Sequence, residues 1–162
     1  MESVSQRVLI VIHGHEPAAW ASQARRAVSM LRNPVLRILA VLDSEHPPFT
    51  SLTPFARRAY SGAITYWREQ QEVCVQGVID QILPFLPGPV EVVRLRGIKS
   101  RARDAIAEHI TGWRADAVVV ATPARSILCR LGARSLSEEL MRETTCAVIV
   151  TGCSATLQGV NE

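Results

Sequence analysis

The sequence has few of the features that mark membrane, secreted or nucleic-acid-binding proteins. Its apolar runs fall far short of the ~20 residues that a helix needs to span a bilayer, and its first residues do not form a signal peptide. Aromatic residues make up 5% of the chain, too few for a platform that stacks bases. The net charge of +3 is too small to indicate binding to nucleic acid. We therefore expect a cytoplasmic protein whose partners include neither a membrane nor nucleic acid.

Catalytic and redox motifs are also missing. There is no Walker motif, G-x-G-x-x-G or G-x-S-x-G, and no pair of carboxylates stands at the strand ends. We therefore predict no catalytic residues and no enzyme, although weak nucleotide hydrolysis stays open. The cysteines form no C-x-x-C pair, which predicts reduced and mostly buried thiols. They are Cys74, Cys129, Cys146 and Cys153.

Two histidines, His13 and His15, stand one residue apart. Paired imidazoles can ligate a metal ion, but a zinc site usually has at least three protein ligands. No third ligand lies nearby in the sequence. We therefore predict no metal site.

Five short apolar runs predict strands. The last two are uninterrupted and rich in β-branched residues, which is typical of strands covered on both faces in a parallel sheet. The runs are residues 7–12, 35–42, 89–95, 117–121 and 147–150.

Helical patterns separate these runs. Apolar residues recur every three or four positions in residues 17–31, 54–86 and 100–113. Ser135 and Glu138 have the spacing of a capping box and open a fourth helix. The pair Ser61-Gly62 predicts a bend or break in the second helix. The tryptophans at positions 20, 67 and 113 fall on helical faces, where core packing is the expected role.

Strands and helices alternate throughout, without a repeat or a linker. This order predicts an α/β protein: a single-domain, doubly wound, five-stranded parallel sheet of order 3-2-1-4-5 with helices on both faces. Ligands of such sheets bind where the strand order reverses, beyond the carboxyl ends of the strands. Those ends are His13-Gly14 and residues 121–126.

The chain resembles the universal stress protein family over residues 7–152. Residues 11–17 (VIHGHEP) are similar to the end of that family's first strand, where an Asp-Gly-Ser-Glu-Pro type sequence is common. Residues 115–120 (ADAVVV) resemble its fourth strand, and residues 135–140 and 145–150 resemble its closing helix and strand. The resemblance implies a universal stress protein-like domain over residues 1–152, followed by a C-terminal tail over residues 153–162.

Nucleotide-binding members of the family carry G-x2-G-x9-G-[S/T] after the fourth strand. In this chain the spacing is kept, but the glycine positions hold Ala121, Ala124 and Arg134, followed by Ser135. His13 replaces the Asp of the first strand. An alanine in place of a glycine with a left-handed backbone costs ~1–2 kcal/mol, and the arginine side chain takes space meant for phosphate. We therefore expect no cofactor, and no ATP binding of the usual kind.

A second interpretation stays open, because Arg125, Arg130 and Arg134 surround the same loop. Guanidinium groups suit phosphate oxygens, so the loop could hold ATP, AMP or another nucleotide through side chains. The alternative is that these arginines form surface ion pairs with Glu138, Glu139 or Glu143. The candidate nucleotide or anion site consists of His13, Gly14, Val41, Ala121, Ala124, Arg125, Ser126, Arg134 and Ser135.

The last strand lies at an edge of the predicted sheet and carries no charge. A bare apolar edge pairs readily with another chain, and the family commonly dimerises through this strand. We predict a homodimer formed by Cys146, Ala147, Val148, Ile149, Val150 and Thr151. The resemblance thus implies a dimeric binding or regulatory protein of the stress response. A protein partner recognised through residues 60–71 is a further possibility.

Overall fold

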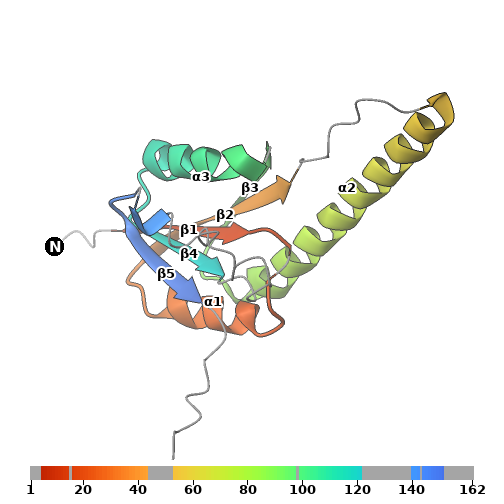
Figure 1. Ribbon diagram of the computed structural model, residues 1–162. Coiled ribbons are helices and arrows are strands. Elements are labelled where there is room, and N and C mark those ends of the chain that lie inside the picture. The colour runs from red at the N-terminus through yellow and green to blue at the C-terminus, as the bar shows by residue number, and fades with distance from the viewer. Residues whose placement is uncertain are drawn as a thin grey trace, which may run out of the picture.

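The computed structural model describes residues 5–14, 16–43, 53–97, 99–121, 140–142 and 144–151 (Figure 1). The sequence produces five strands within these ranges. They are β1 (Gln6–Ile12), β2 (Pro34–Asp43), β3 (Glu91–Gly97), β4 (Ala117–Ala121) and β5 (Ala147–Thr151). The predicted tail and the predicted capping box at Ser135 lie outside the described residues.

The strands form one parallel sheet in the order β3-β2-β1-β4-β5. The predicted fold class is confirmed, including the reversal of strand order at β1. β1 and β4 lie near the centre of the sheet, and all five residues of β4 are buried. Their continuous apolar runs are therefore typical of strands that are covered on both faces of the sheet.

One face of the sheet is covered by α1 (Trp20–Ser29) and the second half of α2 (Pro54–Ile82), as Figure 1 shows. Alternate strand residues point to this face, because side chains of a strand alternate between the two sides of a sheet. They form one apolar cluster with Trp20, Val75 and Ile79, each 2% exposed or less. These helices therefore cover this face of the sheet as far as the carboxyl end of β1.

The opposite face is covered by α3 (Lys99–Trp113), which lies above the sheet in Figure 1. The remaining strand residues pack there against Ile106, Ile110 and Leu140, which is fully buried. Residues 140–142 are helical, in line with the predicted closing helix. Helices therefore lie on both faces, as predicted.

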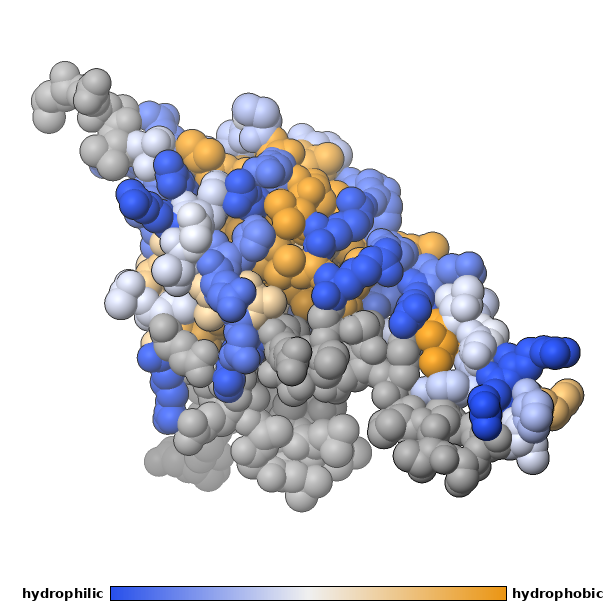
Figure 2. Space-filling model, turned by 90° about the horizontal axis from the view of Figure 1, so that it is seen from above, coloured by the Kyte–Doolittle hydropathy of each residue, from blue (hydrophilic) through white to orange (hydrophobic). Residues whose placement is uncertain are grey.

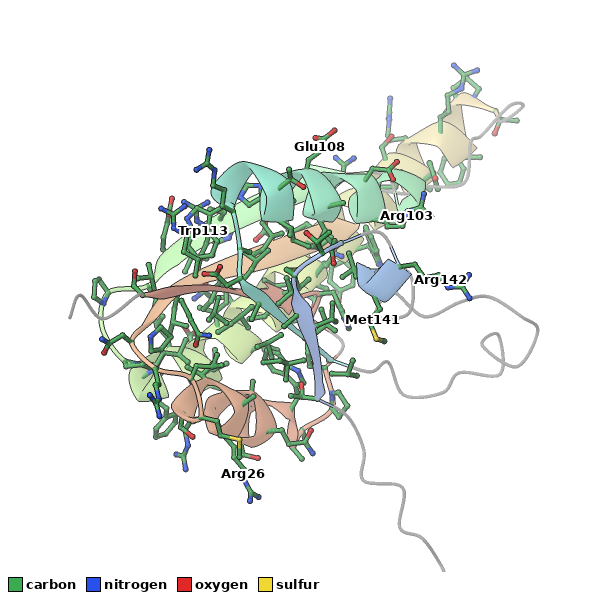
Figure 3. All side chains as sticks on the ribbon, turned by 90° about the vertical axis from the view of Figure 1, so that its left-hand side faces the viewer. Arg26, Arg103, Glu108, Trp113, Met141 and Arg142 are labelled. Carbon is green, nitrogen blue, oxygen red and sulfur yellow. The ribbon has the colours of Figure 1, made fainter. Side chains whose placement is uncertain are left out.

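A cluster of side chains closes the amino edge of the sheet near Trp113, which is labelled in Figure 3. The Arg37 guanidinium lies 4.5 Å from the centroid of this ring and donates to Glu91 at 2.6 Å. Arg7 donates to the Trp113 carbonyl at 2.9 Å, and its amide donates to Asp116. The amino edge is therefore occupied by contacts among the chain's own residues.

The second helix corrects one prediction. α2 runs unbroken through Ser61-Gly62, where a bend or break was expected. The Ser61 hydroxyl donates to the Arg57 carbonyl at 3.0 Å, and Thr65 donates to the Ser61 carbonyl at 3.0 Å. Both bonds run along the helix. The glycine costs about 1 kcal/mol against alanine, which is not enough to end a helix that is anchored in the core.

Three predictions about burial are also wrong. Trp67 is 38% exposed and lies outside both core clusters, whereas Trp20 and Trp113 pack as expected. Cys74 is exposed and Cys146 half-buried, although buried thiols were expected. Cys129 and Cys153 lie outside the described residues. β5 is not covered on both faces, because Ala147 and Val150 are exposed.

Among the described residues, no helix combines the length and the apolar composition needed to cross a bilayer.

Candidate functional site

The structure brings four of the predicted site residues together at the carboxyl edge of the sheet. β1 lies between β2 and β4, with Ile12 paired to Ala40 and Ile10 paired to Val119. Continuing these registers places Val41 level with His13, and Ala121 level with Ile12. His13 and Gly14 follow the end of β1, so they lie at the edge of the sheet between β2 and β4. The topological switch point predicted from the strand order is therefore real.

Two of these four residues belong to the core rather than to an open site. Val41 is 9% exposed and packs in the cluster under α3. Ala121 is 6% exposed and packs in the cluster on the other face. Their side chains thus point to opposite sides of the sheet. Neither offers a polar group, so any recognition here comes from His13, Gly14 and the residues around them.

Glu16 is the residue at this edge that the sequence reasoning missed. Its side chain is 1% exposed. Its carboxylate accepts the His13 amide at 2.5 Å through Oε1 and the Gly14 amide at 2.9 Å through Oε2. His13 Nδ1 lies 3.5 Å from the same Oε1. A buried carboxylate is therefore held by two backbone donors and faces an imidazole.

This arrangement limits what the edge can bind. Backbone amides at the end of a strand are the groups that would receive a phosphate or another anion. Those of His13 and Gly14 are already engaged by an internal negative charge. An anion bound here would therefore lack these two donors. The remaining predicted site residues, Ala124, Arg125, Ser126, Arg134 and Ser135, lie outside the described residues.

Gly14 is required at its position for two reasons. Its φ angle is +86°, in the region that side chains disfavour. An added Cβ would lie 3.1 Å from Val75 Cγ2 and 3.3 Å from Cys74 Cβ. The loop after β1 therefore rests directly on α2, and only glycine allows this approach.

Replacing Gly14 by alanine is expected to lower the free energy of unfolding by about 2 kcal/mol or more. The left-handed backbone accounts for ~1–2 kcal/mol, and the contact with α2 adds to it. Urea denaturation followed by circular dichroism measures the change. Gly88→Ala is the matched control, because Gly88 has φ +74° and no atom within 4 Å of an added Cβ. A Gly14 variant no less stable than the Gly88 variant would show that the contact with α2 is not tight.

The described residues contain no group of three or more His, Cys, Asp or Glu side chains arranged to hold an ion. His13 and Glu16 supply two possible ligands, and Glu16 is held by backbone amides. His15 lies outside the described residues.

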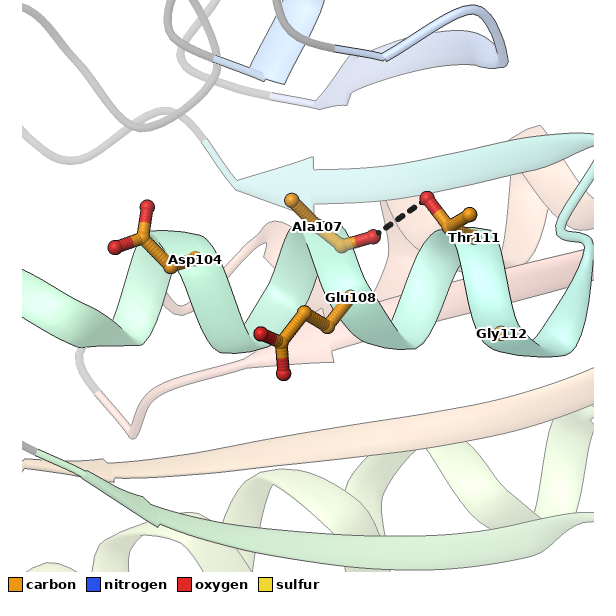
Figure 4. A pocket seen from close by; sticks show the side chains of 5 residues that line it. All are labelled: Asp104, Ala107, Glu108, Thr111 and Gly112. Carbon is orange, nitrogen blue, oxygen red and sulfur yellow. Dashed lines mark hydrogen bonds between the residues drawn. The ribbon is translucent and has the colours of Figure 1, made fainter.

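A shallow hollow of about 530 Å³ lies on the outer side of α3 (Figure 4). It is lined by Asp104, Ala107, Glu108, Thr111 and Gly112. The Thr111 hydroxyl is engaged by the Ala107 carbonyl at 3.0 Å. What remains is two carboxylates on an open surface rather than in an enclosed cavity.

The two edges of the sheet differ in a way that bears on assembly. On β3, Arg94 and Arg96 both pair with Glu72 of α2, and Arg94 also donates to Gln76 at 2.6 Å. These charges guard that edge against pairing with another strand. β5 has no charged residue, and Val150 is 40% exposed. The unguarded edge is therefore the one predicted to form the dimer.

No protein-family model matches the sequence, and no curated protein matches it. A universal stress protein solved in complex with cAMP has a TM-score of 0.56 and 17% identity, over 92% of this chain and 98% of that one. The hypothetical protein MJ0577, whose structure was used to assign its biochemical function, has a TM-score of 0.61 and 13% identity, over 93% and 98%. The chain thus has the universal stress protein fold.

Proposed function

We propose that this chain is a dimeric binding protein of the universal stress protein family, that it acts in the cytoplasm during a stress response, and that it does not bind ATP in the usual way. The fold and the motifs at residues 11–17 and 115–120 support the family. The proposed activity is binding, because the carboxyl edge pairs no nucleophile with a base among the described residues.

The observation that carries this proposal is the engagement of the first-strand amides by Glu16. The carboxylate takes up two donors at the switch point and adds a negative charge where a triphosphate would approach. Ala121, at the first glycine position of the family motif, is 6% exposed and packed in the core. Both features disfavour the close approach of phosphate to main chain on which the usual mode depends.

Titration of ATP into the purified protein tests this proposal. We expect no saturation up to about 1 mM ATP, a binding free energy weaker than ~4 kcal/mol. Isothermal calorimetry at fixed ionic strength gives the measurement. Arg134→Gly is the comparison, and we expect its affinity to be equal or higher, because a bulky side chain has been removed. Micromolar binding by the native protein would defeat the proposal.

The alternative function is a nucleotide module with an arginine-containing phosphate loop. The solved relative in complex with cAMP and the three arginines of residues 125–134 favour it. Here the guanidinium of Arg134 would bind the phosphate itself. The same titration separates the two hypotheses, because this one predicts that Arg134→Gly weakens binding of ATP, AMP or cAMP.

A further inference from the structure

The first half of α2 projects from the body of the protein (Figure 1). In the second half the buried residues Gln71, Val75, Ile79 and Ile82 anchor the helix to the sheet. The side facing away from the core would ordinarily be polar. Instead it carries Phe55, Tyr66 and Val73, whose exposed fractions are 84%, 64% and 65%. Figure 2 shows orange side chains among strongly hydrophilic ones along the projecting helix.

These residues follow a regular spacing. Phe55, Ala59, Gly62, Tyr66, Glu69 and Val73 succeed one another at steps of four and three, the spacing of a helix–helix seam. The seam, as we call these six residues, extends over about 27 Å from Phe55 to Val73 at ~1.5 Å per residue. It lies opposite the buried stripe of the same helix.

The part of the chain that the structure describes gives no reason for this composition. An added Cβ at Gly62 would meet no atom within 4 Å, and its φ is not positive. A glycine there only weakens the helix. The first turn also lacks an acidic residue and contains Arg57, which opposes the helix dipole. A projecting helix of this kind is marginal by itself and gains most from packing against another helix.

We propose that the outer face of α2 binds the same face of a second copy of this chain, as an antiparallel pair of helices about a twofold axis. A self-complementary face must bring residue i of one copy against residue j of the other, and j against i. Phe55 and Val73 have their midpoint at Ile64, and so do Gly62 and Tyr66. One twofold axis at Ile64 therefore places Phe55 of each copy against Val73 of the other. The same axis places each Tyr66 over a Gly62.

The charges agree with the same axis. Arg58 and Glu69 have their midpoint within one residue of Ile64, so each faces the other across the pair. Neither has an ion-pair partner among the described residues of its own chain. They are eleven positions apart, too far for contact within one helix. The charge pattern therefore favours a second copy over a partner of uniform charge.

This contact is separate from the dimer proposed through β5. Each has its own twofold axis, so a chain that uses both assembles beyond a dimer. A single helix pair buries less area than a standard interface. We therefore expect it to form at concentrations roughly a hundredfold above those that suffice for β5.

Charge reversal in the full chain, followed by sedimentation velocity over a range of concentrations, tests the proposal. We expect Arg58→Glu and Glu69→Arg each to weaken the α2 contact by roughly tenfold or more, because each pair occurs twice and becomes repulsive. The double variant R58E/E69R restores the pairing and should return to within about threefold of the native protein. Tyr66→Gln removes the residue seated over Gly62 and should weaken the contact without any change of charge.

Arg68→Glu is the matched control, since it makes the same charge change on α2 outside the seam. Val150→Lys added to each variant removes the β5 contact, so that a dimer formed by α2 alone is observed. A native protein that stays no larger than a dimer at every concentration, and a Val150→Lys variant that stays monomeric, would overturn the proposal. So would equal weakening by Arg58→Glu and Arg68→Glu, or a double variant that stays as weak as the single variants.

Discussion

Replacing Val150 by lysine is expected to turn the dimer that we propose to form through β5 into a monomer and to leave each chain folded. Val150 is 40% exposed on an edge strand without charges. A lysine there places two like charges near the twofold axis and interrupts the apolar contact, as charged side chains do on guarded edges. Multi-angle light scattering at micromolar concentration should show the mass fall by half.

The matched control for this experiment is Met141→Lys. Met141 is 51% exposed and lies beside β5 in Figure 3, so its replacement gains the same charge outside the strand. We expect this variant to remain dimeric. Thermal unfolding should place the stability of both variants within about 1 kcal/mol of the native protein, because both positions are exposed. A native protein that is already monomeric at micromolar concentration, or a dimeric Val150 variant, would refute the β5 interface.

The central strands could be predicted because their apolar residues have the same role, which is to be buried in the core. Each residue of β4 is buried, so its apolar run reports the strand directly. β5 has a similar composition but lies at the edge, and there two of its residues are exposed. Composition alone does not distinguish a central strand from an apolar edge strand. That distinction came from the order of the strands.

The helix α2 shows why a local signal can fail. Ser61-Gly62 favours a break when it is considered alone. Burial of Val75, Ile79 and Ile82 fixes the helix axis several turns away, and each further residue then adds one hydrogen bond. This helix also carries two stripes of apolar residues, the buried stripe and the seam. In the sequence, the apolar residues of both stripes form one periodic pattern, which is why Trp67 and Cys74 were expected in the core.

The candidate site was only partly predictable. The switch point followed from strand order, and His13 and Gly14 lie there. Glu16 was missed because a side chain that binds amides two and three residues earlier leaves no periodic pattern. The available signal was an acidic residue directly before Pro17 and a helix, at the point where a strand ends. Val41 and Ala121 were assigned by their position along a strand, which says nothing of the face to which a side chain points.

Replacing Glu16 by alanine is expected to lower the free energy of unfolding by about 3–5 kcal/mol. Each hydrogen bond to a charged group contributes ~1.5–3 kcal/mol, and removing the carboxylate leaves two amides without their acceptor at a buried strand end. Because small domains are stable by only ~5–15 kcal/mol, the variant should unfold at much lower urea concentration. Urea denaturation followed by tryptophan fluorescence measures this, since Trp20 is 1% exposed in the adjacent helix.

Two further variants separate the hydrogen bonds from the loss of a side chain. Glu108→Ala removes an exposed carboxylate from α3, and we expect a change within about 0.5 kcal/mol. Glu16→Gln keeps the shape and one acceptor oxygen, but sets an amide N–H₂ against a backbone donor, so it should lie between the native protein and Glu16→Ala. If Glu16→Ala is within 1 kcal/mol of the native protein, water replaces the carboxylate at no cost. The amides of His13 and Gly14 would then be open to a phosphate, and the argument against ATP at this edge would fail with them.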